Sequence, residues 1–572
     1  MTFETFIPPR SKSVLEVIGE QDENFQDSKE NFSAIQPACS YTVAKNFSDA
    51  EGNFDTVLFQ SAAIGNLKNS ELVALIKKAA KKLNPRGTLI FTLDNLAFAE
   101  NILAILKEEP AKFKVTLTQS ELENSIEQAG AKISRSLHAS REVAVPKSLL
   151  EISETDVSVF AHIITATLEK LPPKTLIQSF IGEKLVCAPI RIHMPNEFMT
   201  TEPGFFSESS LIQEGCEIYE DNDEYENKIF INQRVSAPSF AYGKKFFEKL
   251  RDANYLYLSE IDDNPKLWQK DYERTGWINF AGVHAVQTST NALADFLRQF
   301  NPNVKIFENH IKKIQPPRNF SKESAQKNRP VTIFFGALNR DKDFEEILPV
   351  INDVAKTYGK KVLFKIIAKQ KLFNSIETQN KILLGKPNVY DGQYISYEEY
   401  ENALHTSDIA LLPLLDSEFN RCKSDLKFIE CASGGAVVLA SPVVYSATVK
   451  DGVNGFIFKN VKEFDEKLRM LIFNKSKRRE VAENAYNYVK NNRLMSQHYE
   501  ERIDWYKELF AKLPELNKET QARIEKLAPN FKDEILTADI KIPVHRKNIS
   551  PQNIQSKNEG LFGPNNEILI PV

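Results

Sequence analysis

The chain has 572 residues, of which 42% are hydrophobic and 26% are charged, and its formal net charge at pH 7 is −4. A chain of this length is too long for one hydrophobic core, so the length predicts three or four domains. The nearly balanced charge excludes the strongly basic surface that is typical of nucleic-acid-binding proteins.

The N-terminus and the cysteines indicate the cellular compartment. Residues Met1 to Thr5 lack the basic-then-apolar pattern of a signal peptide, and no apolar run approaches the roughly 20 residues that span a bilayer. The five cysteines are odd in number and show no CxxC spacing, which predicts free thiols in a reducing compartment and no zinc site. We therefore expect a cytoplasmic protein.

Short apolar runs alternate with amphipathic helices in the first 170 residues. Runs at 14–19, 54–59 and 88–93 predict buried strands, and apolar residues at helical spacing predict a helix over 70–83. Asn84-Pro85-Arg86-Gly87 should end that helix, because proline and glycine interrupt helices. The alternation predicts a parallel sheet with helices on both faces.

Parts of this region resemble the S-adenosylmethionine-dependent methyltransferases. Residues 54–57 resemble the acidic strand of that family, 83–90 its entry into a later strand, and 120–131 its late helix and glycine. The glycine-rich cofactor turn of the family is represented by Gly19 alone. The resemblance implies a methyltransferase-like domain over 1–170 that has lost S-adenosylmethionine and serves docking or oligomerisation, with an active methyltransferase as the alternative.

A second α/β unit is expected over residues 183–320, after a linker at 171–182 that contains Pro172 and Pro173. The hydroxyl side chains that precede residue 291 should cap a helix over 291–300. The strands of this unit are predicted at 183–189, 228–234, 255–263, 284–290 and 304–309.

A third unit is expected over residues 330–512. From 461 to about 513 its pattern is strongly helical, and residues 513–572 are predicted to form a C-terminal helix and an extended tail. The strands of this unit are predicted at 331–336, 362–368 and 409–412, with amphipathic helices between them.

The most informative segment is 423–441, which places lysines and a carboxylate at the start of a helix, followed by a glycine turn and a buried strand. Helix N-termini present unpaired N–H groups and a partial positive charge to phosphate. Lysines add full charges, and Glu430 can accept hydrogen bonds from sugar hydroxyls. The pattern indicates a site for a phosphorylated, hydroxyl-rich ligand, or alternatively an amphipathic helix whose charges are only solvated.

The second and third units resemble the retaining glycosyltransferases of family four, over roughly residues 185–510. In this family two Rossmann-like domains and a terminal helix that crosses back make the GT-B arrangement, with the active site in the cleft between the domains. The motifs that carry the resemblance are Ala285–Leu293, Phe335–Asp343, Val389–Tyr400, Ser407–Pro413, Glu430–Ser441 and Asp451–Phe456.

The resemblance implies transfer of a sugar from a nucleotide diphosphate donor with retention at the anomeric carbon. The enzyme must then stabilise a departing diphosphate with preorganised cations and helix dipoles. Catalytic roles are implied for Arg340, Lys342 and Glu430, with Arg340 standing in for the arginine that the family has at the position of Ala337. The alternatives are solvated loop cations and an ion-paired carboxylate.

The donor-binding residues implied by the resemblance are Gly336, Asn339, Lys423, Ser424 and Lys427. One departure concerns the donor sugar, because Cys422 stands where the family has the first of two glutamates. Glu418, Asn420 and Asp425 are the candidates to replace that glutamate.

Acceptor-side residues are expected in the second unit. Asp262 and Asp263 follow a strand that should end at the cleft, where they orient the acceptor or cap a loop. His193 lies early in the unit and is either an acceptor contact or a structural histidine. We expect no metal ion and no other cofactor, because enzymes of the GT-B type use side chains where others use a divalent ion.

The predicted fold class is therefore α/β, with a methyltransferase-like Rossmann domain before two Rossmann-like domains in GT-B arrangement. The expected function is that of a retaining hexosyltransferase in bacterial surface polysaccharide or glycoprotein synthesis. Its partners would be a nucleotide-sugar donor and a glycan, lipid-linked or protein acceptor, but no nucleic acid. Peripheral contact with the inner face of a membrane and homo-oligomer formation are further expectations. The alternatives are a non-catalytic assembly protein with degenerate domains and a bifunctional methyltransferase–glycosyltransferase.

Overall fold

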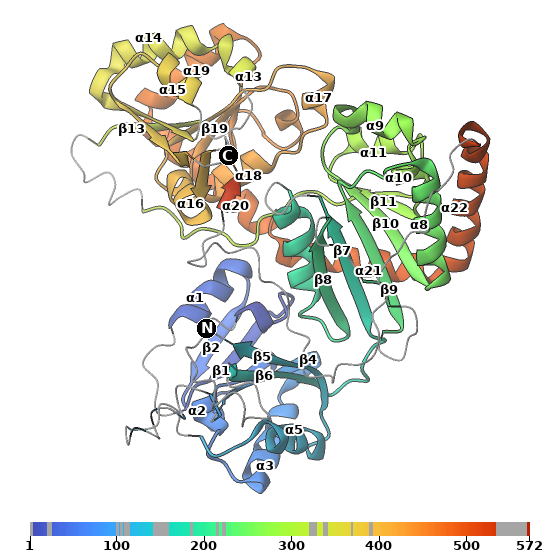
Figure 1. Ribbon diagram of the computed structural model, residues 1–572. Coiled ribbons are helices and arrows are strands. Elements are labelled where there is room, and N and C mark those ends of the chain that lie inside the picture. The colour runs from blue at the N-terminus through green and yellow to red at the C-terminus, as the bar shows by residue number, and fades with distance from the viewer. Residues whose placement is uncertain are drawn as a thin grey trace. The chain divides into compact units, whose positions relative to one another are not determined.

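The computed structural model describes most of the chain, and Figure 1 labels its helices and strands. The described residues are 4–19, 26–95, 97–98, 102, 104, 107, 115–140, 159–182, 187–212, 215, 217–219, 225–319, 329–335, 341–367, 370–387, 393–532 and 569–571. The chain forms two compact units, one of Met1–Thr175 with Glu197–Phe206 and the other of Leu176–Asn196 with Ser207–Val572.

The first unit is built on a six-stranded sheet with the order β2-β1-β3-β4-β6-β5. β1 to β4 run parallel, and β6 runs antiparallel to both of its neighbours. The strands are β1 Ser13–Val17, β2 Ser40–Ala44, β3 Phe54–Phe59, β4 Leu83–Asp94, β5 Lys132–Ser140 and β6 Val159–Thr167. The helices include α1 Gln26–Ile35, α2 Ser61–Ile64, α3 Asn69–Ala80 and α5 Gln119–Gln128.

The predicted helix over 70–83 extends too far. α3 ends at Ala80, and the segment Asn84–Gly87 lies inside β4 instead of after a helix. Leu83 already pairs with Phe54 of β3, and the next pair, Thr56 with Thr88, shows that residues 84–87 form an irregularity in the ladder. Proline and glycine therefore mark a bulge here, which local periodicity does not distinguish from a helix end.

The second unit begins with a sheet of order β12-β11-β10-β9-β7-β8, in which β9 to β12 run parallel. Its strands are β7 Thr175–Ile181, β8 Phe205–Leu211, β9 Asn227–Gln233, β10 Tyr255–Ile261, β11 Ala285–Thr288 and β12 Val304–Ile306. As predicted, Thr290 caps the helix that follows β11, since its hydroxyl accepts a hydrogen bond from the N–H of Leu293.

The linker predicted at 171–182 is wrong, because Thr175–Ile181 forms β7. The side chains of this strand are buried except that of Phe180, which is half-buried, so the run is a core strand rather than a connection. The strand predicted at 183–189 is also wrong where it is described, since Pro189–His193 forms a π-helix. Pro172 and Pro173 precede the division between the two units at Thr175, but the apolar run that follows them is a strand and not part of a linker.

A second parallel sheet of this unit has the order β15-β14-β13-β18-β19-β20. Its strands are β13 Val331–Phe335, β14 Val362–Ile367, β15 Lys381–Leu384, β18 Ile409–Leu412, β19 Val437–Ala440 and β20 Phe456–Ile457. A smaller sheet joins β16 Lys386–Pro387, β17 Gln393–Ser396 and β21 Leu569–Pro571.

Helices flank the strands of both large sheets of the second unit, as Figure 1 shows. Those that follow the strands of the first sheet are α7 Met194–Met199, α8 Phe240–Asp252, α9 Gln269–Arg274, α10 Ile278–Ala281 and α11 Asn291–Leu297. Those around the second are α13 Asp341–Glu345, α14 Leu348–Tyr358, α15 Gln370–Ser375, α16 Tyr397–His405, α17 Glu418–Arg421, α18 Leu426–Ser433, α19 Val461–Phe473 and α20 Lys475–Asn492.

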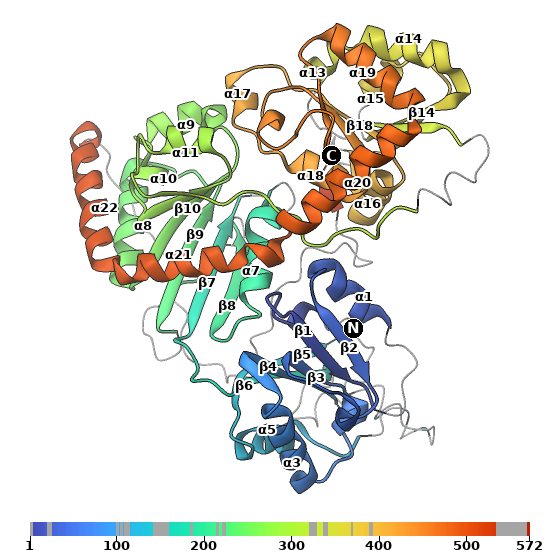
Figure 2. The same ribbon diagram turned by 180° about the vertical axis from the view of Figure 1, so that it is seen from behind.

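Two further helices return from the second sheet of this unit to the first. α21 Tyr499–Ala511 crosses the strands of the first sheet, and α22 Leu513–Leu527 lies beside its helices, as Figure 2 shows. The hydroxyl of Tyr506 donates to the side-chain oxygen of Gln287 at 3.0 Å, and Arg523 Nε donates to the carbonyl of Ala281 at 2.9 Å. The predicted crossing back of the terminal helical region is thereby confirmed.

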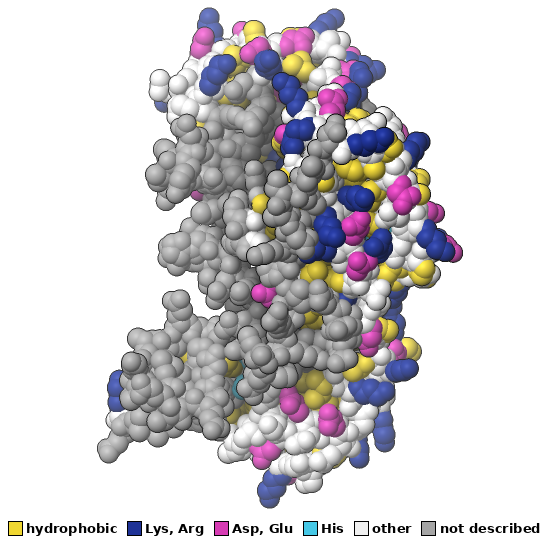
Figure 3. Space-filling view, turned by 45° about the vertical axis from the view of Figure 1, so that its right-hand side comes forward, with side chains coloured by type: hydrophobic (Ala, Val, Ile, Leu, Met, Phe, Trp, Pro, Cys, Tyr) yellow, Lys and Arg dark blue, Asp and Glu magenta, His cyan; other side chains and the backbone are white. Residues whose placement is uncertain are grey.

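The predicted α/β class is confirmed, with two Rossmann-like domains in the second unit and an additional α/β domain before them. Basic and acidic side chains are interspersed over the described atoms of the face in Figure 3. Among the described helices, none is long and apolar enough to cross a membrane.

Gly19, the one glycine of the predicted cofactor turn, serves packing in the first unit. Its φ is +75°, and a Cβ there would lie 2.7 Å from the carbonyl carbon of Ala62 in α2. We expect Gly19→Ala to lower the free energy of unfolding of this unit by about 2–5 kcal/mol, because backbone strain and overpacking add. Hydrogen exchange of the β1 and β3 amides in the full chain measures it.

Gly52→Ala is the matched control for that substitution. Gly52 also has a positive φ, +93°, but a Cβ there would meet no atom within 4 Å. Only the backbone strain of about 1–2 kcal/mol should appear. Equal losses in both variants would contradict the packing role of Gly19.

Candidate active site

The strand order of the second sheet of the second unit reverses between β13 and β18. β14 and β15 lie on one side of β13, whereas β18, β19 and β20 lie on the other. At such a reversal the crossover helices leave toward opposite faces, and ligands bind in the crevice at the carboxyl ends of the strands. The chain that leaves β18 leads into α17 and α18, so the predicted donor residues 423–430 come from this edge.

Lys427 and Glu430 lie one turn apart on α18 and form an ion pair with Nζ to Oε2 at 2.9 Å. Tyr400 of α16 completes a triangle: its hydroxyl donates to Glu430 Oε2 at 2.7 Å and accepts from Lys427 Nζ at 2.8 Å. The side chain of Glu430 is only 15% exposed, whereas that of Lys427 is 37% exposed. A half-exposed ammonium beside a well-oriented carboxylate is suited to a ligand that carries both phosphate and hydroxyl groups.

The N-cap residue of α18 does not cap the helix with its side chain, although the hydroxyl of Ser424 accepts from the N–H of Leu426 at 3.4 Å. The N-cap residue, Asp425, instead accepts from Arg493 Nη1 at 2.5 Å and from the hydroxyl of Thr448 at 2.6 Å. Burial lowers the pKa of Arg493, but the hydrogen bonds and the charge of Asp425 outweigh burial and raise it above its usual range. The partial positive charge of the helix start therefore remains available to an anion.

Lys423 is held by a residue of the other sheet of the same unit. Its Nζ lies 2.5 Å from Asp263 Oδ1 and 4.3 Å from the ring centroid of Phe419. Asp263 and Asp262 both pair with Arg234, at 3.1 and 2.8 Å. Burial opposes the charge of Arg234, but the two aspartates raise its pKa above the usual range.

Ser424 connects to a buried polar network. Its hydroxyl accepts from Asn309 Nδ2 at 2.8 Å, and Asn309 Oδ1 accepts from Arg191 Nη1 at 2.8 Å. Arg191, which is 1% exposed, also donates from Nε to Glu260 Oε1 of β10 at 2.8 Å. The network fixes the segment before α18 relative to the carboxyl end of β10, where Asp262 follows.

Cys422, at the position of the expected glutamate, is 7% exposed. Burial and the nearby carboxylates raise the pKa of its thiol, so the group stays protonated near neutral pH and does not replace a carboxylate. Its backbone carbonyl accepts from the hydroxyl of Thr290 at 3.2 Å. The position thus helps to attach the segment to the first sheet of the unit.

The three candidates to replace the missing glutamate have other partners. Glu418 pairs with Lys266, and Asp425 pairs with Arg493 as described above. The side chain of Asn420 donates to Asp343 Oδ1 at 3.2 Å and to the carbonyl of Leu415 at 2.9 Å. These bonds give the three side chains structural roles in the loop between β18 and α18.

Lys342 lies exposed on α13, next to the buried Asp343. Asp343 Oδ1 also accepts from the N–H of Leu415 at 2.8 Å, so α13 is joined to the loop after β18. His193, on the π-helix, is half-buried, and the contacts above do not include it. The remaining predicted residues, Gly336, Asn339 and Arg340, lie outside the described residues.

Several residues of the site were missed in the sequence. Tyr400 lies in the expected motif 389–400, but nothing local shows that its hydroxyl reaches Glu430. Arg493 and Asn309 are separated from their partners by 68 and 115 residues. Such pairings arise from the topology, and no spacing rule within one element indicates them.

Residues 316–488 match the model of one protein family, described as glycosyl transferases group 1. This part of the chain is similar to the group 1 glycosyltransferases. The predicted enzyme class, a glycosyltransferase, is thereby confirmed, and enzymes of this group transfer a sugar from a nucleotide-sugar donor. A search of curated proteins finds no match.

Several solved structures of other proteins are similar to this chain. A Rickettsia africae glycosyltransferase is 14% identical, with 59% of this chain and 98% of that one covered and a TM-score of 0.40. Anabaena Alr3699/HepE in complex with UDP-glucose is 12% identical, with 58% and 100% covered and a TM-score of 0.40. S. aureus TarM is 16% identical, with a TM-score of 0.36; the match covers 50% of this chain and 55%, about half, of TarM.

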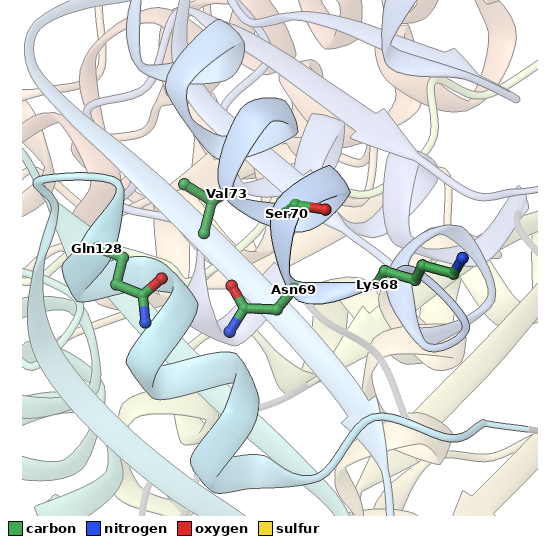
Figure 4. A pocket seen from close by; sticks show the side chains of 5 residues that line it. All are labelled: Lys68, Asn69, Ser70, Val73 and Gln128. Carbon is green, nitrogen blue, oxygen red and sulfur yellow. The ribbon is translucent and has the colours of Figure 1, made fainter.

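A surface groove in the first unit does not form a comparable site. It lies between the start of α3 and the end of α5, where Asn69 and Gln128 approach each other and Lys68 points away, as Figure 4 shows. The residues that line it carry no carboxylate, imidazole or thiol. Among the described residues, no group of three or more His, Cys, Asp or Glu side chains could hold a metal ion.

The partly buried pair of Lys423 and Asp263 should be coupled more strongly than an exposed pair. Their side chains are 23% and 13% exposed, so solvent screens the interaction only in part. In a double-mutant cycle of Lys423→Met and Asp263→Asn, we expect a coupling free energy of about 1–3 kcal/mol. Denaturant unfolding of the second unit in the full chain, without ligand, measures it.

The pair of Lys266 and Glu418 is the matched control, because it joins the same two domains with side chains that are 41% and 66% exposed. An exposed pair should couple by about 0.5 kcal/mol or less. A coupling at Lys423 no larger than at Lys266 would show that the Asp263 contact does not hold the segment.

Proposed function

We propose that the chain transfers a sugar from a nucleotide diphosphate donor, with retention at the anomeric carbon, to a glycan, lipid-linked or protein acceptor. The observation that carries the proposal is the joint position of Lys427 and Glu430 at the start of α18, within the domain that matches the glycosyltransferase family. The expected setting in bacterial surface polysaccharide or glycoprotein synthesis remains part of this proposal.

Charge stabilisation is the main task of such a site. When the bond between the sugar and the diphosphate breaks, negative charge develops on the leaving group, and preorganised cations and N–H groups lower the barrier. Lys427 and the start of α18, whose N-cap residue makes no side-chain cap bond, provide such groups at the carboxyl edge of the sheet. In the described structure the ammonium of Lys427 pairs with Glu430. In the proposed complex it binds the diphosphate instead.

Glu430 then holds hydroxyls of the donor. Its carboxylate has two oxygens, and the described contacts of Tyr400 and Lys427 both reach Oε2. Tyr400 orients the carboxylate and keeps it in place when Lys427 turns to phosphate. Lys342 and Arg340 of the β13–α13 region are proposed as further cations, with Gly336 and Asn339 as donor contacts in the same region.

The ion pairs of Asp262 and Asp263 change the roles proposed for these two acceptor-side residues. Because Asp263 binds Lys423 and shares Arg234 with Asp262, we assign to Asp263 the positioning of Lys423 and to Asp262 the positioning of Arg234. Ser424 is likewise held by Asn309, with its hydroxyl as a hydrogen-bond acceptor. His193 stays a candidate acceptor contact.

We further propose that the reaction requires no metal or other cofactor and that the N-terminal domain is methyltransferase-like without S-adenosylmethionine. The antiparallel β6, which lies between β4 and the edge strand β5, supports the likeness, and the packing of Gly19 on Ala62 supports the loss of the cofactor turn. A non-catalytic assembly protein is the second candidate function, which the protonated, buried Cys422 favours.

Calorimetric titration of the full chain with UDP, GDP, ADP and S-adenosylmethionine tests the proposal. We expect Lys427→Ala to weaken binding of the preferred nucleotide about 10- to 100-fold, because a charge-assisted hydrogen bond contributes about 1.5–3 kcal/mol. Lys342→Ala and Glu430→Ala should also weaken it, and EDTA should not. Lys462→Ala is the control, since its side chain is 85% exposed on α19.

Two results would overturn the proposal in different directions. Failure of every nucleotide to bind the unmodified chain would favour the assembly protein. Tight binding of S-adenosylmethionine in the same experiment would favour the bifunctional enzyme.

A further inference from the structure

A second, smaller cavity lies at the opposite edge of the sheet that carries the donor residues. Its volume is about 120 Å³, which holds several water molecules or one small anion. Val331, the first residue of β13, and Asp408, which directly precedes β18, line it. The amino ends of the strands face this cavity, whereas α18 starts at their carboxyl ends.

Five cationic side chains and one carboxylate line the cavity: Arg318, Arg329, Lys475, Arg478, Arg479 and Asp408. Asp408 accepts from Arg318 Nη2 at 3.0 Å, from Arg329 Nη1 at 2.9 Å and from the N–H of Thr332 at 2.8 Å. One carboxylate thus holds two guanidinium groups in place. Arg318 is almost fully buried, with 1% of its side chain exposed, and Arg329 is 24% exposed.

The other three cations come from the first two turns of α20. Arg478 Nη1 donates to the carbonyl of Ile472 at 2.8 Å, which fixes its guanidinium between the end of α19 and the cavity. Lys475 is exposed at the first position of the helix, and Arg479 pairs with Glu483 at 2.7 Å. Because α20 has 18 residues, its start also contributes the positive end of a helix dipole.

Cationic side chains outnumber carboxylates five to one in the lining of the cavity, and Arg318 and Arg329 share that one carboxylate, Asp408. Burial and then repulsion from Arg329 and Arg318 lower the pKa of the neighbouring Lys365 to about 8, although Asp408 opposes this. The same groups act on Arg478, whose pKa is also lowered, by burial first.

We propose that this cavity binds a phosphate-type oxyanion, either inorganic phosphate or the terminal group of a phosphate monoester. Guanidinium groups match the geometry of phosphate oxygens, and the start of α20, where the Asn474 side chain caps the N–H of Lys477, adds the positive end of a helix dipole. The bound anion joins Arg318 and Arg329, which both lie in the connector between β12 and β13, to the start of α20. The site is separate from the donor site and does not depend on the proposed transfer reaction.

Titration of the full chain with sodium phosphate, against sodium chloride at equal ionic strength, tests the proposal by calorimetry and by thermal unfolding. Phosphate should bind and raise the unfolding temperature. Arg479→Gln, at a position 52% exposed, and Arg329→Gln should each weaken phosphate binding at least about tenfold. Arg469→Gln is the control, because Arg469 lies on the neighbouring α19 and pairs with Asp353 and Asp465.

A second set of titrations distinguishes the source of the anion. Binding of glycerol 3-phosphate that is weakened by Arg479→Gln assigns the cavity to soluble phosphates. Binding to phosphatidylcholine vesicles with phosphatidic acid, weakened by the same substitution, assigns it to a lipid headgroup.

Three results would overturn the proposal. The first is that phosphate does not bind the unmodified chain, and the second is that Arg479→Gln and Arg329→Gln bind it as tightly as Arg469→Gln. The third is that Lys427→Ala abolishes phosphate binding, which would place the anion in the donor site instead.

Discussion

Lys423, Ser424 and Asp425, three consecutive residues ahead of α18, are each bonded to a different part of the second unit. Lys423 reaches Asp263 after β10, Ser424 reaches Asn309 after β12, and Asp425 reaches Arg493 at the end of α20. The segment is therefore fixed from both Rossmann-like domains at once. The direction of α18, and with it the position of Lys427 and Glu430, depends on these three bonds.

Donor binding at Lys423 would compete with the ion pair between Lys423 and Asp263, which joins the two Rossmann-like domains. Asp263 neutralises Lys423 in the described state, and removing one partner of a partly buried ion pair leaves the other charge uncompensated. A diphosphate that binds Lys423 in addition to Lys427 would leave Asp263 with Arg234, which already pairs with it at 3.1 Å. Since Arg234 remains as a partner, the exchange does not strand a carboxylate. In the proposed function, donor binding is thus linked to the contact between the domains.

The sequence predicts elements whose pattern is local and fails where a pairing is remote. The strand 255–263, the cap at Thr290 and the segment from Lys423 to Glu430 all follow from periodicity, hydroxyl placement and charge at a helix start. The two prolines before β7 predict a linker, and the pairing of β7 with β9 is not visible in its own residues. The triangle with Tyr400 and the bond from Arg493 arise only after the helices pack. At Cys422 the sequence predicts only a departure from the family, whereas in the structure its carbonyl accepts from Thr290.

α20 connects the two edges of the glycosyltransferase sheet. Its first turns carry Arg478 and Arg479 at the amino edge, and its C-cap, Arg493, holds Asp425 at the start of α18. At about 1.5 Å per residue, a helix of this length acts as a rigid strut of roughly 27 Å. An anion at its first turn and a diphosphate at α18 would thus act on opposite ends of one element. Any coupling between them must be reciprocal, because each ligand changes the other's affinity by the same factor. The buried bond of Arg493, which is 5% exposed, to Asp425 and the packing of Phe428 on Tyr488 both connect α20 to the donor segment, so a movement of α20 can reach it by either contact.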